Sequence, residues 1–438
     1  MRIGSSPAQT ALPKPARVFW VINGLLALLC PIVIVVNRYV FHLGAGVHWQ
    51  PYTSPFLPWG HFCDFWNFHD RFMMYHTTVF YSTTAGSIFS YPAPLSLLYA
   101  LFFLSQHNQH TIFTVTTTLP IFGMLYFLGC EMIAGGISKR VATLFVISAF
   151  LFSYPYWFEW ELGNIEVCVF LIVAFGVFAW LRGQLYLAAA LFGIAGSMKI
   201  FPFLYLGLLL SRKQSRQFGF GLLVAAVLYP LSVWMACPSF SIALAGIRAS
   251  SRALGTGLLP YWDWVLANVD HSLWSFYKQV MHLLGYKNER PMWEVTTYTA
   301  LTAIAGTALY FLRIRRLPML NQLICLSVAS ILLPPMSNDY TLLYLYLPWG
   351  LLLISAIRDE QKGFMRPGVL GAFICFALLF SAESEIVIAR AAVAGQLKAA
   401  TLVVLLCIAL TYPFVLPSEQ GDTQVHKLAG AELTAIEQ

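Results

Sequence analysis

Charge is scarce in this chain. Of its 438 residues, 10% are charged and 19 are acidic, whereas 58% are hydrophobic. A soluble domain carries about 25% charged residues, and no hydrophilic stretch here is long enough to form a separate domain of ordinary size. The composition therefore excludes a globular protein with a membrane tail and predicts an all-α polytopic membrane protein.

Motifs typical of several soluble enzyme classes are absent. The sequence has no Walker loop, no Rossmann glycines, no His-Glu-x-x-His pair and no nucleophile elbow. Its eight cysteines are scattered without metal-ligand spacing and are predicted to be small buried hydrophobes. The net charge of +7 is explained by basic cytoplasmic loops, so it does not require nucleic acid as a partner.

Apolar runs of spanning length are abundant. They lie near 17–37, 111–131, 141–158, 164–181, 217–237, 294–312, 318–335, 341–357, 368–386 and 399–416. Two less regular segments, 92–104 and 185–210, leave the expected number of membrane helices open at about 11–13. Because Lys199 and Pro202 interrupt the second segment, it is interpreted as a hairpin of two short helices.

Clusters of Lys and Arg at alternate helix ends predict the orientation. The positive-inside rule places these clusters and both termini in the cytoplasm. One transmembrane domain then covers 1–416, with outer loops at 38–110 and 238–293 and a polar cytoplasmic tail at 417–438. Most acidic residues and most of the 13 tryptophans fall on the outer side. They indicate either an interfacial aromatic belt or a carbohydrate-binding face, since rings stack on sugars and carboxylates accept hydroxyl hydrogen bonds.

Asp64 is the leading catalytic candidate. It lies in an aromatic-rich stretch, beside Phe65 and Trp66, after the first expected helix. A carboxylate within hydrogen-bond reach can take the proton of an attacking sugar hydroxyl. Partial burial among the rings would raise the pKa of Asp64 and make it a better base. The alternative is a helix cap or a solvated loop acid.

Further candidates occur where helices are expected to begin, break or end. Lys199 lies inside an apolar run, where a cation is costly and usually functional; it is predicted to contact a lipid phosphate unless it snorkels to the cytoplasm. Glu166 opens an apolar helix and either interacts with its positive end or faces, with Asn164, the same cavity as Asp64. The other candidates lie beside prolines or in polar turns: Tyr91, His271, Asp339 and Tyr340.

The order and spacing of these residues resemble glycosyltransferase family 87, a member of the C-type superfamily of membrane glycosyltransferases. The resemblance covers most of the chain from about Asp64. It rests on these segments: Asp64-Phe65, Phe89-x-Tyr91-Pro92-x-Pro94, Gly163-Asn164-x-Glu166, Ala195-Gly196-Ser197-Met198-Lys199-x-x-Pro202, His271-Ser272 and the turn from Pro334 to Tyr340. Two departures stand out. The family tends to have Gln-x-Asn where this chain has Asn164 and Glu166, and many members carry His at the place of Asp339.

The resemblance implies a C-type glycosyltransferase fold with interfacial helices in a large first outer loop. It implies inverting, metal-independent transfer of a sugar, mannose above all, from a polyprenyl-phosphate donor to a lipid-linked or glycan acceptor. The reaction would take place at the outer face of a bacterial-type plasma membrane without a cofactor, with Asp64 as the base. Two alternatives stay open: a flippase or transporter for lipid-linked sugars, and a ligase that transfers a whole polymer. A flippase needs charges along a path through the bilayer, and the spans hold few apart from Lys199.

Overall fold

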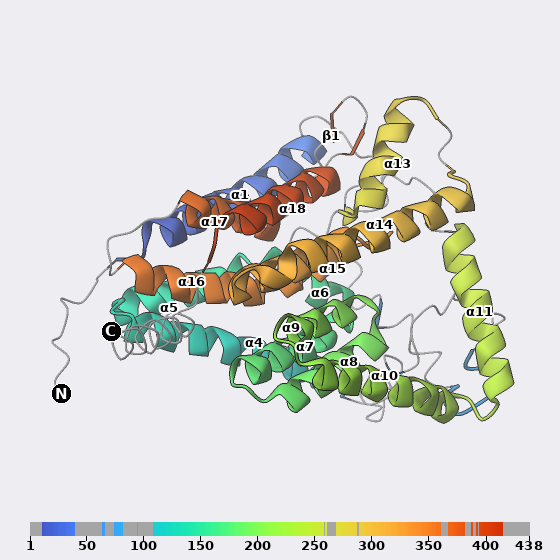
Figure 1. The fold of residues 1–438 in the computed structure, drawn as a ribbon. Coiled ribbons are helices and arrows are strands. Elements are labelled where there is room, and N and C mark those ends of the chain that lie inside the picture. Colours follow the sequence, from blue (N-terminus) through green and yellow to red (C-terminus); the bar gives the residue numbers. More distant parts are fainter. Residues whose placement is uncertain are drawn as a thin grey trace, which may run out of the picture.

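A computed structural model of the chain describes residues 11–39, 64–65, 74–81, 94, 108–257, 259–260, 269–286, 289–360, 367–381, 387–388, 391–392 and 394–414. Most of the first outer loop, most of the segment at 92–104 and the expected tail at 417–438 lie outside these residues. Within them the chain is helical apart from one two-stranded hairpin, which confirms the all-α prediction (Figure 1).

The helices follow the expected apolar runs closely in most of the chain. In the first half they are α1 (Lys14–Tyr39), α4 (Gln109–Ala134), α5 (Lys139–Leu151), α6 (Tyr154–Leu162), α7 (Glu166–Leu181), α8 (Leu185–Met198), η1 (Phe201–Leu206), α9 (Gly207–Ser211) and α10 (Ser215–Ala236). In the second half they are α11 (Phe240–Gly257), α13 (Leu273–Leu283), α14 (Met292–Leu312), η2 (Ile314–Arg316), α15 (Met319–Leu332), η3 (Asp339–Leu345), α16 (Tyr346–Glu360), α17 (Pro367–Phe380) and α18 (Ala394–Thr411). The hairpin pairs β1 (Val387–Ile388) with β2 (Ala391–Ala392) in antiparallel register.

The described residues include five helices that are long and apolar enough to cross a membrane. They are Gln109–Ala134, Ser215–Ala236, Met292–Arg316, Asp339–Ile357 and Ala394–Thr411, and α5 with α6 forms a sixth candidate that is bent by 49°. Other apolar helices, such as α7, α8, α15 and α17, have 10–17 residues. The chain is therefore an integral membrane protein, although several of the 11–13 expected crossings are helices shorter than a full span.

Prolines explain where the helices differ from the apolar runs. The run at 141–158 was expected to form one helix, but α5 ends at Leu151 and α6 begins at Tyr154. Pro155 has no backbone N–H to donate to the Leu151 carbonyl, and its ring would clash with that carbonyl, so it can stand in the first turn of a helix but not continue one. Pro202 acts in the same way after Lys199, where α8 gives way to η1. The predicted interruption of 185–210 is thus confirmed.

Small residues bring helices α8 and α10 into close contact. A Cβ atom added at Gly193 of α8 would lie 2.3 Å from the carbonyl oxygen of Gly221 in α10. Such glycines allow two helix backbones to approach each other within a membrane. Helices α7, α8 and α10 therefore lie together on one side of the molecule, whereas α1, α17 and α18 lie together on the other (Figure 1).

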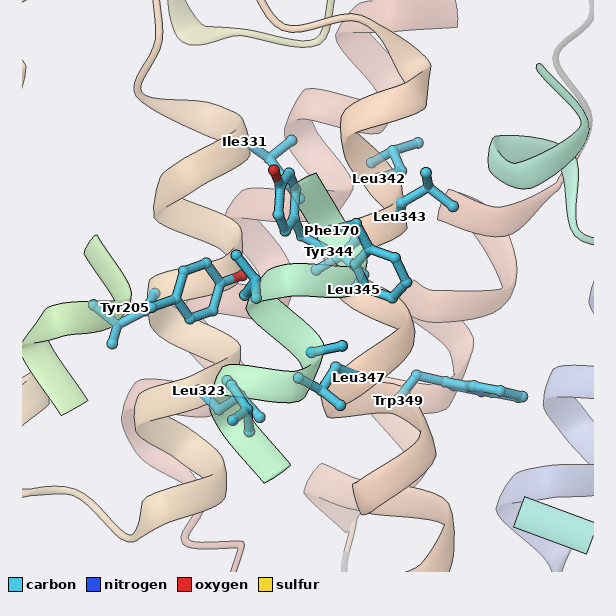
Figure 2. Packing of buried hydrophobic residues seen from close by; sticks show 14 of the residues in the cluster. Phe170, Tyr205, Leu323, Ile331, Leu342, Leu343, Tyr344, Leu345, Leu347 and Trp349 are labelled. Carbon is cyan, nitrogen blue, oxygen red and sulfur yellow. The ribbon is translucent and has the colours of Figure 1, made fainter. Parts of the chain in front are cut away.

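The segment from η3 into α16 runs through the centre of the core. Figure 2 shows its residues Leu342, Leu343 and Tyr344 among side chains of neighbouring helices, including Phe170 of α7. The rings of Phe170 and Tyr344 are in edge contact, with their centroids 6.1 Å apart. This packing fixes the position of η3, which carries two of the predicted site residues at its start.

Candidate functional site

The turn between α6 and α7 is built by its own side chains. Helix α6 ends at Leu162, and the next residue, Gly163, has a φ of 63°, in the left-handed region that glycine adopts without strain. The Asn164 side-chain oxygen Oδ1 then accepts the backbone N–H of Glu166 at 3.0 Å, and Glu159 Oε1 accepts that of Val167 at 2.8 Å. Two of the amides that a helix N-terminus leaves unpaired are satisfied in this way.

Asn164 connects this turn to Asp64. Its Nδ2 donates a hydrogen bond of 2.7 Å to Asp64 Oδ2. Since Oδ1 of the same amide accepts the Glu166 N–H, the amide cannot flip without losing both bonds. Burial raises the pKa of Asp64, while the hydrogen bond from Asn164 and the charge of Lys199 act in the opposite direction. Asn164 and Asp64 therefore lie together, which is one of the two alternatives that the sequence left open.

Lys199 lies at the break between α8 and η1, with an extended backbone (φ −140°, ψ 142°). Its ammonium group forms an ion pair with Glu166 Oε2 (the Lys199 pair). Tyr344 donates its hydroxyl to the other oxygen of Glu166 at 2.5 Å. The Lys199 Nζ also lies 5.1 Å from the centre of the Tyr340 ring, in range of a cation–π interaction.

Glu159 is a buried acid next to this group. Its side chain is 0% exposed, and its Oε2 has no hydrogen-bond partner among the described residues. An ionised carboxylate is costly to bury unless it is paired. Asp64, Glu159 and Glu166 thus place three carboxyl groups around one lysine, Lys199, so this part of the site has more acids than cations.

A second charged group is centred on Asp339, at the start of η3. Its Oδ1 accepts a hydrogen bond from Lys398 Nζ at 2.8 Å, which is called the Lys398 pair. His271 Nδ1 lies 3.4 Å from the same oxygen, and the Tyr154 hydroxyl donates to Oδ2 at 3.4 Å. These side chains come from η3, α18, α6 and the segment before α13, so Asp339 joins four parts of the chain.

The segment that carries His271 is fixed by its neighbour Asp270. Asp270 Oδ1 accepts the backbone N–H groups of Ser272 and Ser337, each at 3.0 Å. Asp270 and Asn338 also form an isolated antiparallel bridge. Burial raises the pKa of Asp270, and the charge of Lys278 lowers it in part. Asp270 therefore ties the start of α13 to the turn before η3.

An aromatic stack lies between the two lysine pairs. The rings of Tyr154 and Phe158 are 5.7 Å apart, and those of Phe158 and Tyr340 are stacked at 6.3 Å. Lys398 Nζ lies 4.8 Å from the centre of the Tyr154 ring. Lys199 Nζ lies in the same way 5.1 Å from the centre of the Tyr340 ring. Each lysine is thus paired with one carboxylate and placed over the tyrosine at its own end of the stack.

All predicted site residues that the structure describes belong to this connected arrangement. They are Asp64, Asn164, Glu166, Lys199, His271, Asp339 and Tyr340. Tyr91 lies outside the described residues. In the described ranges, no three His, Cys, Asp or Glu side chains gather as a metal site would require.

The sequence reasoning missed Lys398, Tyr344, Tyr154 and Glu159. A signal for Lys398 was present, because a lysine on the expected outer side runs against the positive-inside rule. Glu159 had a weaker signal as an acid in an otherwise apolar stretch. The two tyrosines gave none, since tyrosines at helix ends are common in membrane proteins.

Comparison with known proteins identifies the family. The sequence profile of glycosyltransferase family 87 matches residues 89–335, which is more than half of the chain. The matched part includes Asn164, Glu166, Lys199 and His271. Among curated proteins and solved structures, no match was found. The chain belongs to glycosyltransferase family 87 and is a membrane glycosyltransferase.

Proposed function

We propose that the protein transfers a sugar from a polyprenyl-phosphate donor to a lipid-linked or glycan acceptor at the outer face of the membrane. Family membership supports sugar transfer, and one contact supports the site: the hydrogen bond from Asn164 to Asp64, within reach of the charge of Lys199. A base, a cation and polar side chains at the end of an apolar helix are the groups that this reaction needs.

The proposed reaction is a single displacement. Asp64 accepts the proton of the acceptor hydroxyl as its oxygen bonds to the anomeric carbon of the donor sugar. The bond between that carbon and the phosphate oxygen breaks, and the polyprenyl phosphate leaves with the bonding electrons. Because the attack comes from the face opposite the phosphate, the configuration at the anomeric carbon is inverted.

Lys199 is proposed to stabilise the departing phosphate. A fixed positive charge is most effective where negative charge develops in a site that excludes water. The Lys199 side chain is 15% exposed, so it lies at the edge of the buried network. The proposal needs no metal ion or other cofactor, since the lysine supplies the positive charge.

Mannose is the sugar proposed first, by analogy with the family. Glu166 and Asp339 stand where the family tends to carry Asn and His, and each is paired here with a lysine. His271 and Tyr340 adjoin these pairs and are proposed to contribute to substrate binding, as is Tyr91. Since carboxylates accept hydrogen bonds from sugar hydroxyls, the two acids are the positions at which sugar selectivity would differ from other members.

The test is transfer by the purified protein from a panel of radiolabelled polyprenyl-phosphate sugars to native lipid extract, with the product identified. We expect one donor to be consumed and Asp64→Asn to abolish transfer while the variant elutes as the wild type does. A nucleotide sugar serves as the control donor, and we expect the protein not to transfer its sugar. Near-normal turnover by Asp64→Asn would remove the base assignment. A donor that crosses vesicle membranes without being consumed would support a flippase instead.

A further inference from the structure

Helix α13 buries polar side chains and exposes apolar ones. Its buried face carries Trp274, Ser275, Lys278 and Gln279. Its exposed face carries a separate set of side chains, which is called the α13 apolar face: Phe276, Val280, Leu283 and Leu284. A helix on the surface of a soluble protein shows the opposite arrangement. Leaving these large side chains in water would forgo the favourable free energy of burying them.

The buried polar face holds α13 firmly in this orientation. The Trp274 indole N–H donates to the carbonyl oxygen of Leu259 at 2.7 Å, and its ring lies 5.3 Å from that of Tyr298 in α14. The Ser272 side chain caps the helix by accepting the Ser275 N–H at 3.0 Å. The apolar face therefore points away from the protein because the other face is anchored, and rotation about the helix axis would break the two Trp274 contacts.

The position of α14 indicates what covers the apolar face. Met292–Arg316 is one of the helices long and apolar enough to cross the membrane, and it begins eight positions after Leu284. Trp293, at the first turn of this span, is 67% exposed, and so is Leu284. Tyr286 between them is also exposed. Exposed Trp and Tyr at the end of a span are typical of the headgroup region of a bilayer. The α13 apolar face therefore adjoins the end of a membrane-spanning helix, at the level where lipid headgroups are expected.

We propose that α13 lies in the boundary between headgroups and acyl chains, with Phe276, Val280, Leu283 and Leu284 inserted into the leaflet at the Met292 end of α14. The partner is the lipid surface itself. An amphipathic helix binds such a surface through the area of its apolar face. In Figure 1, α13 stands at the edge of the molecule beside the start of α14, where no described element covers its outer side.

This placement has a consequence for the site. His271 directly precedes the Ser272 cap of α13 and lies 3.4 Å from Asp339. Asp270 bonds to the turn before η3. A helix held at headgroup depth therefore holds the Asp339 group at the same depth. A sugar carried on a lipid phosphate is presented at that level, so lipid contact would align the site with its substrate.

The test uses the full-length protein in nanodiscs that contain phosphatidylcholine with a photoactivatable diazirine in the acyl chain. After irradiation, labelled residues are located by mass spectrometry of peptides. We expect labels on the α13 apolar face, and on Leu301 and Ile304 of α14 as a positive control, because both are exposed on the span. Labelled α14 with unlabelled α13 would overturn the proposal, as would a cross-link between two copies through α13.

A pair of variants separates lipid contact from folding. Phe276→Ser combined with Leu283→Ser should reduce labelling of α13 several-fold and leave labelling of α14 unchanged, whereas Leu283→Met should retain both. Unchanged α13 labelling in the double serine variant would contradict insertion of this face. The labelling does not depend on catalysis, so its outcome is separate from that of the proposed glycosyl transfer.

Discussion

Asn164 fixes the orientation of the Asp64 carboxylate and favours its ionised form. The Asn164 amide is fixed at both ends, by the Glu166 N–H and by the Asp64 carboxylate. A donor aimed at one carboxylate oxygen favours the ionised form of the acid, and the ionised form is the one that can act as a base. Asn164 is therefore a positioning residue for Asp64 in the proposed reaction.

Replacing Asn164 should move the pH dependence of transfer. Asn164→Ala removes a hydrogen bond to the ionised form, so the pKa of Asp64 rises and the base is lost at a higher pH. The acidic limb of kcat/KM against pH should therefore shift to higher pH.

A matched control for this change exists in α1. Asn23 is also buried, and its Nδ2 donates to the carbonyl oxygen of Ala377 at 3.2 Å, far from Asp64 in sequence. Asn23→Ala should lower stability without moving the acidic limb. If both variants left the limb unchanged, Asn164 would have no effect on the protonation of Asp64.

At the scale of elements, the break between α8 and η1 places Lys199 against α7. A buried ion pair adds little net stability, but removing one partner leaves the other charge uncompensated. Lys199→Met should therefore lower the free energy of unfolding by about 3–5 kcal/mol. Adding Glu166→Gln removes the orphaned charge and should recover most of that loss in thermal unfolding.

Donor binding distinguishes the structural role of Lys199 from its proposed role. If Lys199 contacts the phosphate, KM for the donor is higher in the Lys199→Met, Glu166→Gln double variant than in Glu166→Gln alone, even though the fold is restored. Recovery of the wild-type KM together with stability would show that Lys199 serves the fold alone.

The contact between α8 and α10 gives a prediction independent of catalysis. Gly193→Ala places a Cβ against the Gly221 carbonyl oxygen, and backbone atoms cannot move aside easily. Such overpacking costs about 1–3 kcal/mol, so the melting temperature in detergent should fall. Gly219→Ala is the control on α10, because its Cβ would enter open space. There alanine should leave stability unchanged or raise it by up to about 1 kcal/mol. Equal effects at the two positions would refute the close-packing explanation.

At the scale of the whole molecule, the orientation rests on the distribution of Lys and Arg. The positive-inside rule places Arg216 in the cytoplasm and Tyr286 outside, and both side chains are exposed. In a background without native cysteines, Tyr286→Cys should react with an impermeant maleimide in intact cells. Arg216→Cys should react only after permeabilisation. The reverse pattern would invert the proposed topology and place the site in the cytoplasm.

Much of the fold could be predicted because membrane helices are encoded locally. The apolar run at 217–237 corresponds to Ser215–Ala236, and the interruption at Lys199 follows from Pro202. The separation of α5 from α6 was missed, although Pro155 is visible in the sequence. An apolar run indicates only that its side chains are buried in lipid or protein. It does not show where the helix is interrupted, because the residues on both sides of the interruption are apolar.

The candidate site divides in a similar way. Asn164, Glu166 and Lys199 could be found because each is a polar residue in an apolar context. The partner of Glu166, Tyr344, and the partner of Asp339, Lys398, could not be assigned, since these contacts join residues that are 178 and 59 positions apart in the chain. A single sequence shows which polar side chains are costly to bury, but it does not show which of them meet.

The aromatic stack between the two lysine pairs has a consequence for redesign. Tyr154, Phe158 and Tyr340 form a continuous path from Lys398 to Lys199. Replacing Glu166 alone with the residue of a relative would leave Asp339 and Lys398 unchanged at the other end of the stack. If the two acids select the sugar as proposed, exchanging sugar preference between homologues requires Glu166, Asp339, both lysines and the three rings to be replaced together.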